Sequence, residues 1–204
     1  MKKTEPKARY REKQKAQTRA LILETARNMF DELGYEKTTL RKVAAKAGIS
    51  HGAILKHFEN KSDILACALY DVIKKQGEKA FDSVPENATV QEQFLYIAEQ
   101  LFRYYSLNPG LSSTLIKHNL FITGEWATKF DEQTGRFMDK LTDLIEQAKK
   151  RKEIKKNADS ELITMSFFSH YIFVLIICLK ETDFDHGIKM LEKLFEQTIS
   201  GSRL

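Results

Sequence analysis

Cysteine is scarce in this sequence, which holds two in 204 residues. Cys67 and Cys178 stand far apart, and neither has a second Cys or a His nearby at the spacing of a zinc site or a redox pair. We therefore expect buried thiols in a protein of the reducing cytoplasm, with no metal site and no cofactor. A disulfide or a redox sensor is the less favoured alternative.

Proline and glycine are also few, at three and nine residues, and their scarcity favours long helices. A chain of this length with ordinary apolar content can bury a sizeable core in one or two domains. The sequence lacks the GxSxG, GxGxxG, Walker A and HExxH patterns, so we expect no enzymatic activity. The predicted fold class is all-α, with about nine helices.

Long apolar runs are missing as well. The richest run, residues 167–179, is too short to span a bilayer and contains Ser169 and His170. The amino terminus has no apolar stretch of the kind found in secretory signals. We expect a cytoplasmic protein in which residues 167–179 form part of a buried helix.

Positive charge is concentrated in the first third of the chain. Residues 1–65 hold 15 Lys and Arg against 8 Asp and Glu, whereas residues 66–204 hold 18 against 20. Such asymmetry favours a protein that presents one end to a polyanion, because Lys and Arg replace the counterions condensed on phosphate. A membrane surface explains the asymmetry less well. Residues 1–15 lack a core-forming period and are predicted to be a flexible basic arm, which either aids solubility or contacts DNA.

Residues 38–65 have the pattern of a helix-turn-helix. Apolar residues at helical spacing, from Leu40 to Ala47, are followed by Gly48, which can adopt the positive φ of a helix end. Ser50 can cap a second helix, whose buried edge would be formed by Ile54 and Phe58. The opposite face is small or cationic and suits a DNA major groove. It carries His51, Gly52, Ala53, Lys56 and His57.

Other polar residues flank this motif. Thr38 and Thr39 can cap the first of the two helices, and a hydroxyl at that end can also meet a phosphate. Arg41 is either a guanine contact or a solvated surface residue. Lys61 stands beside the capped start of the next helix, where a phosphate would be favoured.

The segment from Thr18 to Leu65 resembles the DNA-binding domain of the tetracycline-repressor (TetR/AcrR) family of bacterial transcription regulators. The matching positions are Ala26, Phe30, Gly34, Tyr35, Thr38, Thr39, Val43, Ala44, Ala47–Ser50, Gly52, His57, Phe58, Lys61 and Leu65. The resemblance implies DNA contacts by Thr38 or Thr39, the recognition helix and Lys61. One departure is Leu55, where the family usually has an aromatic residue whose phenol contacts phosphate. Leu55 cannot donate that bond, although it can touch a thymine methyl.

The remainder of the chain is predicted to form a helical effector-binding and dimerisation domain. We expect domains at 16–65 and 66–204, with their boundary inside a helix that continues to Phe81. Further helices are expected at 88–107, 111–121, 125–152, 159–180 and 184–200. The helix at 159–180 is apolar on nearly all sides. Together with the last helix it is predicted to form a four-helix interface in a homodimer.

Aromatic and His residues of this second domain are candidates for an effector pocket, which the family resemblance implies. Aromatic residues at helical spacing are more often core, and a structural role is the commoner one for each His. The candidates are Phe94, Phe102, Tyr105, His118, Phe121, Trp126, Phe130, Phe168, His170 and Tyr171.

The predicted function is a sequence-specific, homodimeric transcriptional repressor that a small apolar or aromatic ligand releases from a palindromic operator, with activation as the alternative sign of regulation. The alternatives are a helical carrier or enzyme that uses the second-domain cavity, and a dimeric adaptor for protein partners. The confinement of basic excess to residues 1–65 favours DNA over both.

Overall fold

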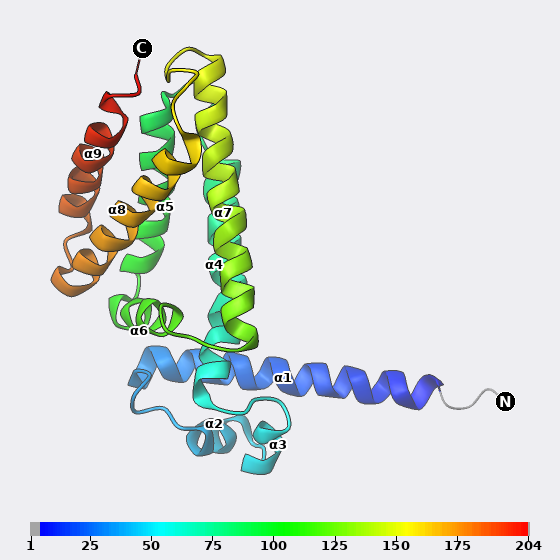
Figure 1. Cartoon of the computed structure of the whole chain (residues 1–204). Coiled ribbons are helices and arrows are strands. Elements are labelled where there is room, and N and C mark those ends of the chain that lie inside the picture. Colours follow the sequence, from blue (N-terminus) through cyan, green and yellow to red (C-terminus); the bar gives the residue numbers. More distant parts are fainter. Residues whose placement is uncertain (1–4, 204) are drawn as a thin grey trace. The chain divides into compact units, whose positions relative to one another are not determined.

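The structure is a computed structural model that describes residues 5–203, with side chains from Arg9 onward. Within this range it contains nine helices and no strand, which confirms the all-α prediction (Figure 1). Two compact units divide the chain, residues 1–71 and 72–204. The division falls inside a helix, six residues after the boundary predicted from the sequence.

The first unit contains α1 (Glu5–Leu33), α2 (Leu40–Ala47), α3 (His51–Leu55) and the start of α4 (Lys61–Asp82). Helix α1 begins at Glu5, so the prediction of a structureless arm is wrong for residues 5–15, while residues 1–4 lie outside the described residues. The physical reason is composition, since this segment is rich in Lys, Arg, Glu, Gln and Ala, which all favour helix. A segment without a buried face can continue a helix that packs farther along the chain.

Short-range hydrogen bonds define the ends of α2 and α3. The Thr39 side chain accepts a hydrogen bond from the Lys42 amide at 3.3 Å, and the Ser50 side chain accepts one from the Ala53 amide at 3.1 Å. Between them Gly48 has a φ of 67°, and its own N–H bonds back to α2. These contacts form the predicted cap, turn and cap in sequence order.

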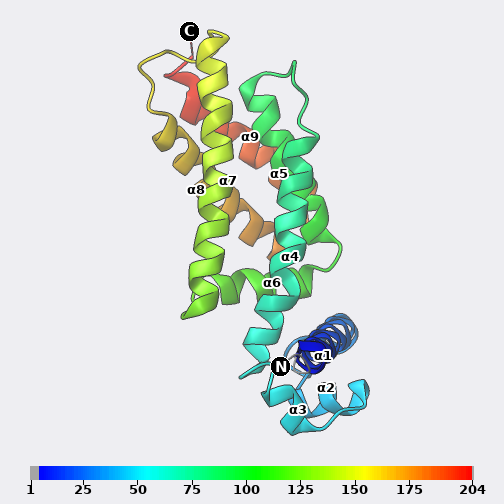
Figure 2. The same ribbon diagram turned by 90° about the vertical axis from the view of Figure 1, so that its right-hand side faces the viewer.

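The second unit contains the rest of α4 and five further helices. They are α5 (Val90–Ser106), α6 (Pro109–Asn119), α7 (Glu125–Lys150), α8 (Ser160–Glu181) and α9 (Phe184–Ser200). Helix α6 begins two residues before its predicted start, because Asn108 caps the Leu111 amide and Pro109 suits a first helical turn. Figure 2 shows α8 crossing behind α7, and the two helices are in contact.

Three aromatic rings from three helices hold the core of the second unit together. The Phe94 ring centroid lies 4.7 Å from that of Phe167 and 4.9 Å from that of Phe195, and all three side chains are buried. Helix α8 packs against α5, α6, α7 and α9 and is long and apolar enough to cross a membrane by length and composition alone. Those contacts are the ones expected of a core helix in a helical domain.

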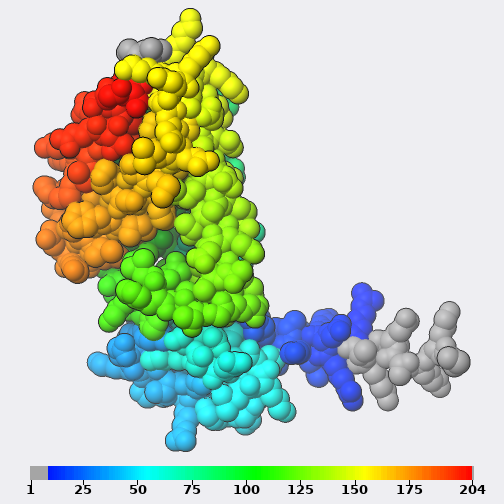
Figure 3. Space-filling model, viewed as in Figure 1, coloured from blue at the N-terminus to red at the C-terminus, as the bar shows by residue number. Residues whose placement is uncertain are grey.

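Packing within one chain does not cover α8 completely. Leu162, Met165 and Phe173 are 61%, 60% and 58% exposed. In Figure 3 the orange and red atoms of α8 and α9 occupy one side of the second unit's surface. The prediction of a buried helix therefore holds for only part of its circumference, because a single layer of neighbours leaves an apolar stripe open.

Candidate nucleic-acid interface and ligand pocket

Helix α3 presents its polar face to solvent. Ile54 is fully buried and Phe58 is 4% exposed, so these two residues anchor the helix to the unit. His51, Gly52, Leu55 and Lys56 are exposed, as is Ser50, and Ala53 is half-buried. The structure thus places His51, Gly52, Leu55 and Lys56 on the accessible surface of a short helix, whereas His57, which was predicted to face the groove with them, is half-buried.

Thr38 corrects the predicted interface. Its side chain is fully buried, and its hydroxyl lies within hydrogen-bonding distance of the Gly34 oxygen at 2.9 Å and the Met29 oxygen at 3.2 Å. Thr38 therefore supports the turn between α1 and α2 and is not available to DNA. Thr39 and Arg41 are exposed at the amino-terminal end of α2, where free amides also favour a phosphate.

Lys61 is half-buried and contributes to the same turn. Its ammonium donates to the Tyr35 carbonyl oxygen at 2.7 Å and lies 3.9 Å from the centre of the Tyr35 ring. The Tyr35 hydroxyl in turn pairs with Ser62 at 3.0 Å. Because an ammonium has three donors, these contacts leave a role for Lys61 at a phosphate as a prediction.

The carboxyl end of α3 is held by Arg19, a residue that the sequence reasoning missed. The Arg19 guanidinium donates to the His57 carbonyl oxygen at 3.1 Å and to the Cys67 sulfur at 3.1 Å, and lies 4.3 Å from the Phe58 ring centre. Its position three residues before buried Ile22, on the inward face of α1, is the signal that could have identified it.

The His57 side chain lies in a cationic environment. It is half-buried, and its Nδ1 is buried with no hydrogen-bond partner among the described residues. Burial lowers the pKa of His57, and the charges of Lys15, Arg19 and Lys56 lower it further. The imidazole is therefore neutral near pH 7 in the absence of an anion.

A pocket opens within the second unit, between α4, α5, α6, α7 and α8. The space between its atoms, including the open mouth, is about 960 Å³. Most of the wall is aromatic or aliphatic, which suits an apolar ligand. The lining residues are Ile73, Lys74, Gly77, Glu78, Phe81, Leu101, Tyr105, Leu115, Ile116, Asn119, Phe130, Gln133, Thr134, Arg136, Phe137, Lys140, Phe168, Tyr171 and Ile172.

Four of the predicted pocket residues line this space: Tyr105, Phe130, Phe168 and Tyr171. The other six do not, and each has a physical reason. Phe94 and Phe102 are buried in aromatic contacts of the core, and Phe121 is 82% exposed beyond the end of α6. Trp126 lies in a tilted contact with the Phe130 ring and does not line the pocket, and His118 and His170 lie on helices that line it but are not among its lining residues.

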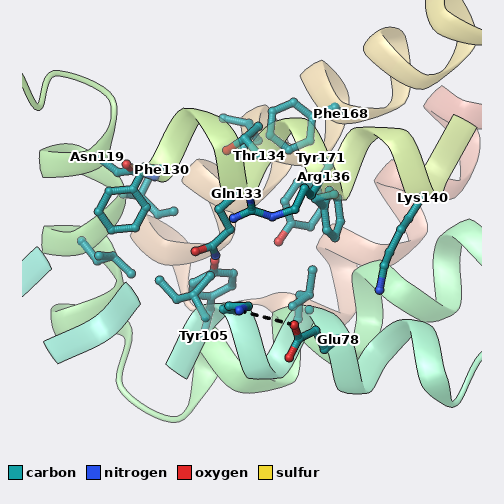
Figure 4. A pocket seen from close by; sticks show the side chains of 18 of the residues that line it. Glu78, Tyr105, Asn119, Phe130, Gln133, Thr134, Arg136, Lys140, Phe168 and Tyr171 are labelled. Carbon is teal, nitrogen blue, oxygen red and sulfur yellow. Dashed lines mark ion pairs between the residues drawn. The ribbon is translucent and has the colours of Figure 1, made fainter. Parts of the chain in front are cut away.

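The deep wall of the pocket carries polar groups inside an apolar surface. Tyr105 and Tyr171 share a hydrogen bond, and burial raises the pKa of both phenols, so they remain protonated. The Gln133 Oε1 atom is buried and has no hydrogen-bond partner in the described part of the chain. Figure 4 shows these three side chains directed toward the same space. A ligand with a hydrogen-bond donor would satisfy Gln133.

The mouth of the pocket is charged. Lys74 pairs with Glu78 at 3.9 Å, Arg136 lies 3.8 Å from Glu132, and the Lys140 ammonium lies 5.1 Å from the Phe81 ring centre (Figure 4). Three cations and one carboxylate, Glu78, therefore line the pocket, and Lys74 is the cation paired with that carboxylate. Periodicity did not indicate these residues, because charged positions on a helix ordinarily face solvent.

No cluster of three or more His, Cys, Asp or Glu residues that could hold a metal ion occurs in the described range. Cys178 is buried and Cys67 is half-buried, and neither forms a disulfide in the described part of the chain. Burial raises the pKa of the Cys178 thiol to about 11, so little of the nucleophilic thiolate is present near pH 7.

Comparisons with known proteins point to one class. A family model described as bacterial regulatory proteins, tetR family, matches residues 22–67. The fatty acid metabolism regulator protein of Bacillus subtilis is 25% identical over 159 residues, which cover 76% of this chain and 80% of that protein. The transcriptional repressor BepR of Brucella suis is 28% identical over 196 residues, with 93% and 88% coverage.

Solved structures share the fold along almost the whole chain. The regulator FadR from Bacillus subtilis, in complex with stearoyl-CoA, has a TM-score of 0.70 and 20% identity, covering 89% of this chain and 98% of its own. FadR from Thermus thermophilus, in complex with lauroyl-CoA, has a TM-score of 0.70 and 14% identity, with 91% and 95% coverage.

Proposed function

The chain belongs to the tetR family of bacterial transcription regulators, and from this premise we propose that it is a homodimeric repressor released from DNA by an acyl thioester of coenzyme A. The DNA-binding part of this proposal rests on the match over residues 22–67 and on the exposed polar face of α3. The carrier, enzyme and adaptor alternatives are not favoured, because the named relatives are regulators.

At the operator, each protomer would place α3 in a major groove. His51, Ala53 and Lys56 would meet base edges, while Thr39 and Lys61 would contact phosphates. Leu55 is half exposed, so it can pack on a thymine methyl. Two protomers related by a two-fold axis would read a palindrome with half-sites about one helical turn apart, or slightly more.

The apolar stripe on α8 supports the homodimer. Leu162, Met165 and Phe173 are exposed in one chain, and a partner copy of the same stripe would cover them. Burial of apolar surface contributes roughly 25 cal/mol per Å², so an interface of ordinary size suffices for a stable dimer. A soluble dimer of this kind would work in the cytoplasm.

The observation that carries the ligand assignment is the pocket of the second unit. Its aromatic and aliphatic wall suits an acyl chain, and the cations Lys74, Arg136 and Lys140 at its mouth suit the phosphates of coenzyme A. Support comes from the Bacillus subtilis relative, named for fatty acid metabolism, and from the two FadR structures that hold stearoyl-CoA and lauroyl-CoA.

Gly77 offers a direct test, because it lies on α4 in the pocket wall. A Cβ built on Gly77 meets only the Phe137 ring, at 3.9 Å, so Gly77→Leu would place a side chain in the pocket without a backbone clash. Gly135→Leu on α7 is the matched control, since nothing lies within 4 Å of a Cβ there and Gly135 does not line the pocket.

The experiment begins with selection of bound sequences from random duplex DNA. Stearoyl-CoA is then titrated into the complex of the selected operator with each protein. We expect stearoyl-CoA to dissociate the wild-type and Gly135→Leu complexes, and Gly77→Leu to need at least about tenfold more ligand, because lost burial of a few methylene groups exceeds 1.4 kcal/mol. Dissociation of all three complexes at the same concentration would place the ligand outside this pocket.

A further inference from the structure

The first turns of α1 extend beyond the packed body of the first unit. Ile22 is the first buried residue of the helix, and every described residue from Arg9 to Gln17 is exposed. This segment carries Arg9, Arg11, Lys13 and Lys15 against the single described acid Glu12. A helix that buries nothing over two turns and keeps this charge is available to a polyanionic partner.

The helical register sorts these four cations into two faces. Arg11, Lys15 and Arg19 are spaced four residues apart, and their stripe continues into buried Ile22 and Ala26. At 100° per residue, Arg9 and Lys13 are turned roughly 120° and 160° away from the middle of that stripe. The cations of the stripe therefore lie on the side of α1 that packs against α2 and contacts His57 and Phe58 after α3.

Contacts at the end of α3 show which part of the first unit the stripe of Arg11, Lys15 and Arg19 faces. Arg19 donates to the His57 carbonyl oxygen at 3.1 Å, and the charge of Lys15 reaches the His57 ring. Within the first unit, Figure 1 shows the blue start of α1 projecting past α3. In the described part of the chain, neither Arg11 nor Lys15 takes part in an ion pair.

We propose that Arg11 and Lys15 form a rigid phosphate-binding edge that contacts the DNA backbone beside the half-site read by α3. The inference rests on the proposed DNA-binding function and adds a second contact surface to it. Because this part of α1 is helical, Arg11 and Lys15 lie on a different face from Arg9 and Lys13, and only the first pair is expected to contact DNA. Contacts with phosphate carry no sequence information directly, so the edge contributes affinity and register on any duplex.

Paired substitutions of equal charge test the proposal. Arg11→Ala with Lys15→Ala removes two cations from the stripe, and Arg9→Ala with Lys13→Ala removes two from the other face. Alanine favours helix in both cases, and Arg19 stays intact because it supports α3. Circular dichroism and urea unfolding verify that both variants fold like the wild type. Operator affinity is then measured from low to moderate salt.

We expect the stripe variant to bind more weakly than the wild type at low salt, and the slope of log affinity against log salt to be shallower by about 1.8, or 0.9 for each lost phosphate contact. At 0.1 M salt the Arg9 and Lys13 variant should stay within about twofold of the wild type, because long-range attraction is then screened within about 10 Å.

Equal losses in the two variants would overturn the proposal, because they would indicate diffuse attraction or a flexible arm. Wild-type affinity and slope in both variants would overturn it as well. Failure of the wild-type protein to bind any selected duplex would instead overturn the proposed function. The wild-type titration thereby separates failure of the edge from failure of the regulator.

Discussion

Helices α3 and α8 are held in place by different kinds of contact. The five residues of α3 depend on the Ser50 cap, the Gly48 turn and two anchoring side chains, all within ten residues of one another, and on one distant residue, Arg19, which holds the segment after the helix. Helix α8 has a cap of its own in Asp159, but its place is decided by rings that arrive from α5 and α9. Helix α3 is thus specified largely by its neighbours in sequence, and α8 by packing between distant segments.

The largest expected effect tests packing between α8 and α9. A Cβ on Gly187 would lie 2.1 Å from the Cys178 sulfur and 3.3 Å from a Val174 methyl. Gly187→Ala should lower the free energy of unfolding by up to about 3 kcal/mol, because an overpacked core must shift. Urea unfolding measures the loss.

Two variants control this prediction. Gly135→Ala has open space and should raise the free energy of unfolding by about 0.5 to 1 kcal/mol through helix propensity. Cys178→Ala should rescue part of the Gly187→Ala loss in the double variant. Simple additivity of the two substitutions would show that the sulfur is not the obstacle.

The next effect concerns the turn that supports α2 in the first unit. Thr38→Val keeps the shape but removes the hydroxyl that reaches the Gly34 and Met29 oxygens. The free energy of unfolding should fall by roughly 1 to 2 kcal/mol. Operator affinity of the folded variant should match the wild type at low temperature. A loss of DNA affinity without a loss of stability would instead indicate that Thr38 contacts DNA.

A smaller effect compares equivalent caps in the two units. Ser50→Ala and Thr89→Ala each remove a side-chain cap, at α3 and α5, and each should cost about 1 kcal/mol in the free energy of unfolding. Only Ser50→Ala should also weaken operator binding, because α3 has only five residues and depends on this cap to keep its helical shape. Fluorescence anisotropy with labelled operator distinguishes them, and equal affinity would contradict the local origin of α3.

The smallest effect is a pH dependence at His57. Its pKa is lowered in the folded state, so the unfolded chain takes up a proton first as pH falls below about 6.5. The contribution of neutral His57 to the free energy of unfolding should therefore be fully present above that pH and be lost as the pH falls below it. His57→Gln should flatten this decline in urea unfolding between pH 7.5 and 5.5, whereas His51→Gln, on an exposed position, should retain it.

The sequence predicted the DNA-binding surface better than the pocket. It located α3 and the face that carries His51, Gly52 and Lys56, because caps, a turn glycine and a four-residue apolar spacing all act between near neighbours. It misplaced Thr38, since a hydroxyl before a helix looks the same whether it faces inward or outward. It also took residues 5–15 for a flexible arm, because helix propensity without a buried face leaves no periodic signal.

The pocket was harder to predict. Phe94 and Phe168 both lie at inward positions of their helices, yet one fills the core and the other lines the cavity. Gln133 and Lys140 were missed because nothing in their local sequence distinguishes a cavity-facing polar residue from a solvated one. Which side of a helix meets a void depends on how neighbouring helices are spaced, and spacing is a property of the assembled unit.

By itself, the sequence determined that this chain is helical, that a helix-turn-helix lies between residues 38 and 65, and that its positive charge belongs to that end. Those features follow from interactions over a few residues, which a linear pattern records. Only the tertiary structure decided which aromatic rings and which cations line the pocket. It also decided that Arg11 and Lys15 share a face with the buried stripe of α1. Each of these depends on side chains brought together from distant helices, or on a helix continuing where its own sequence buries nothing.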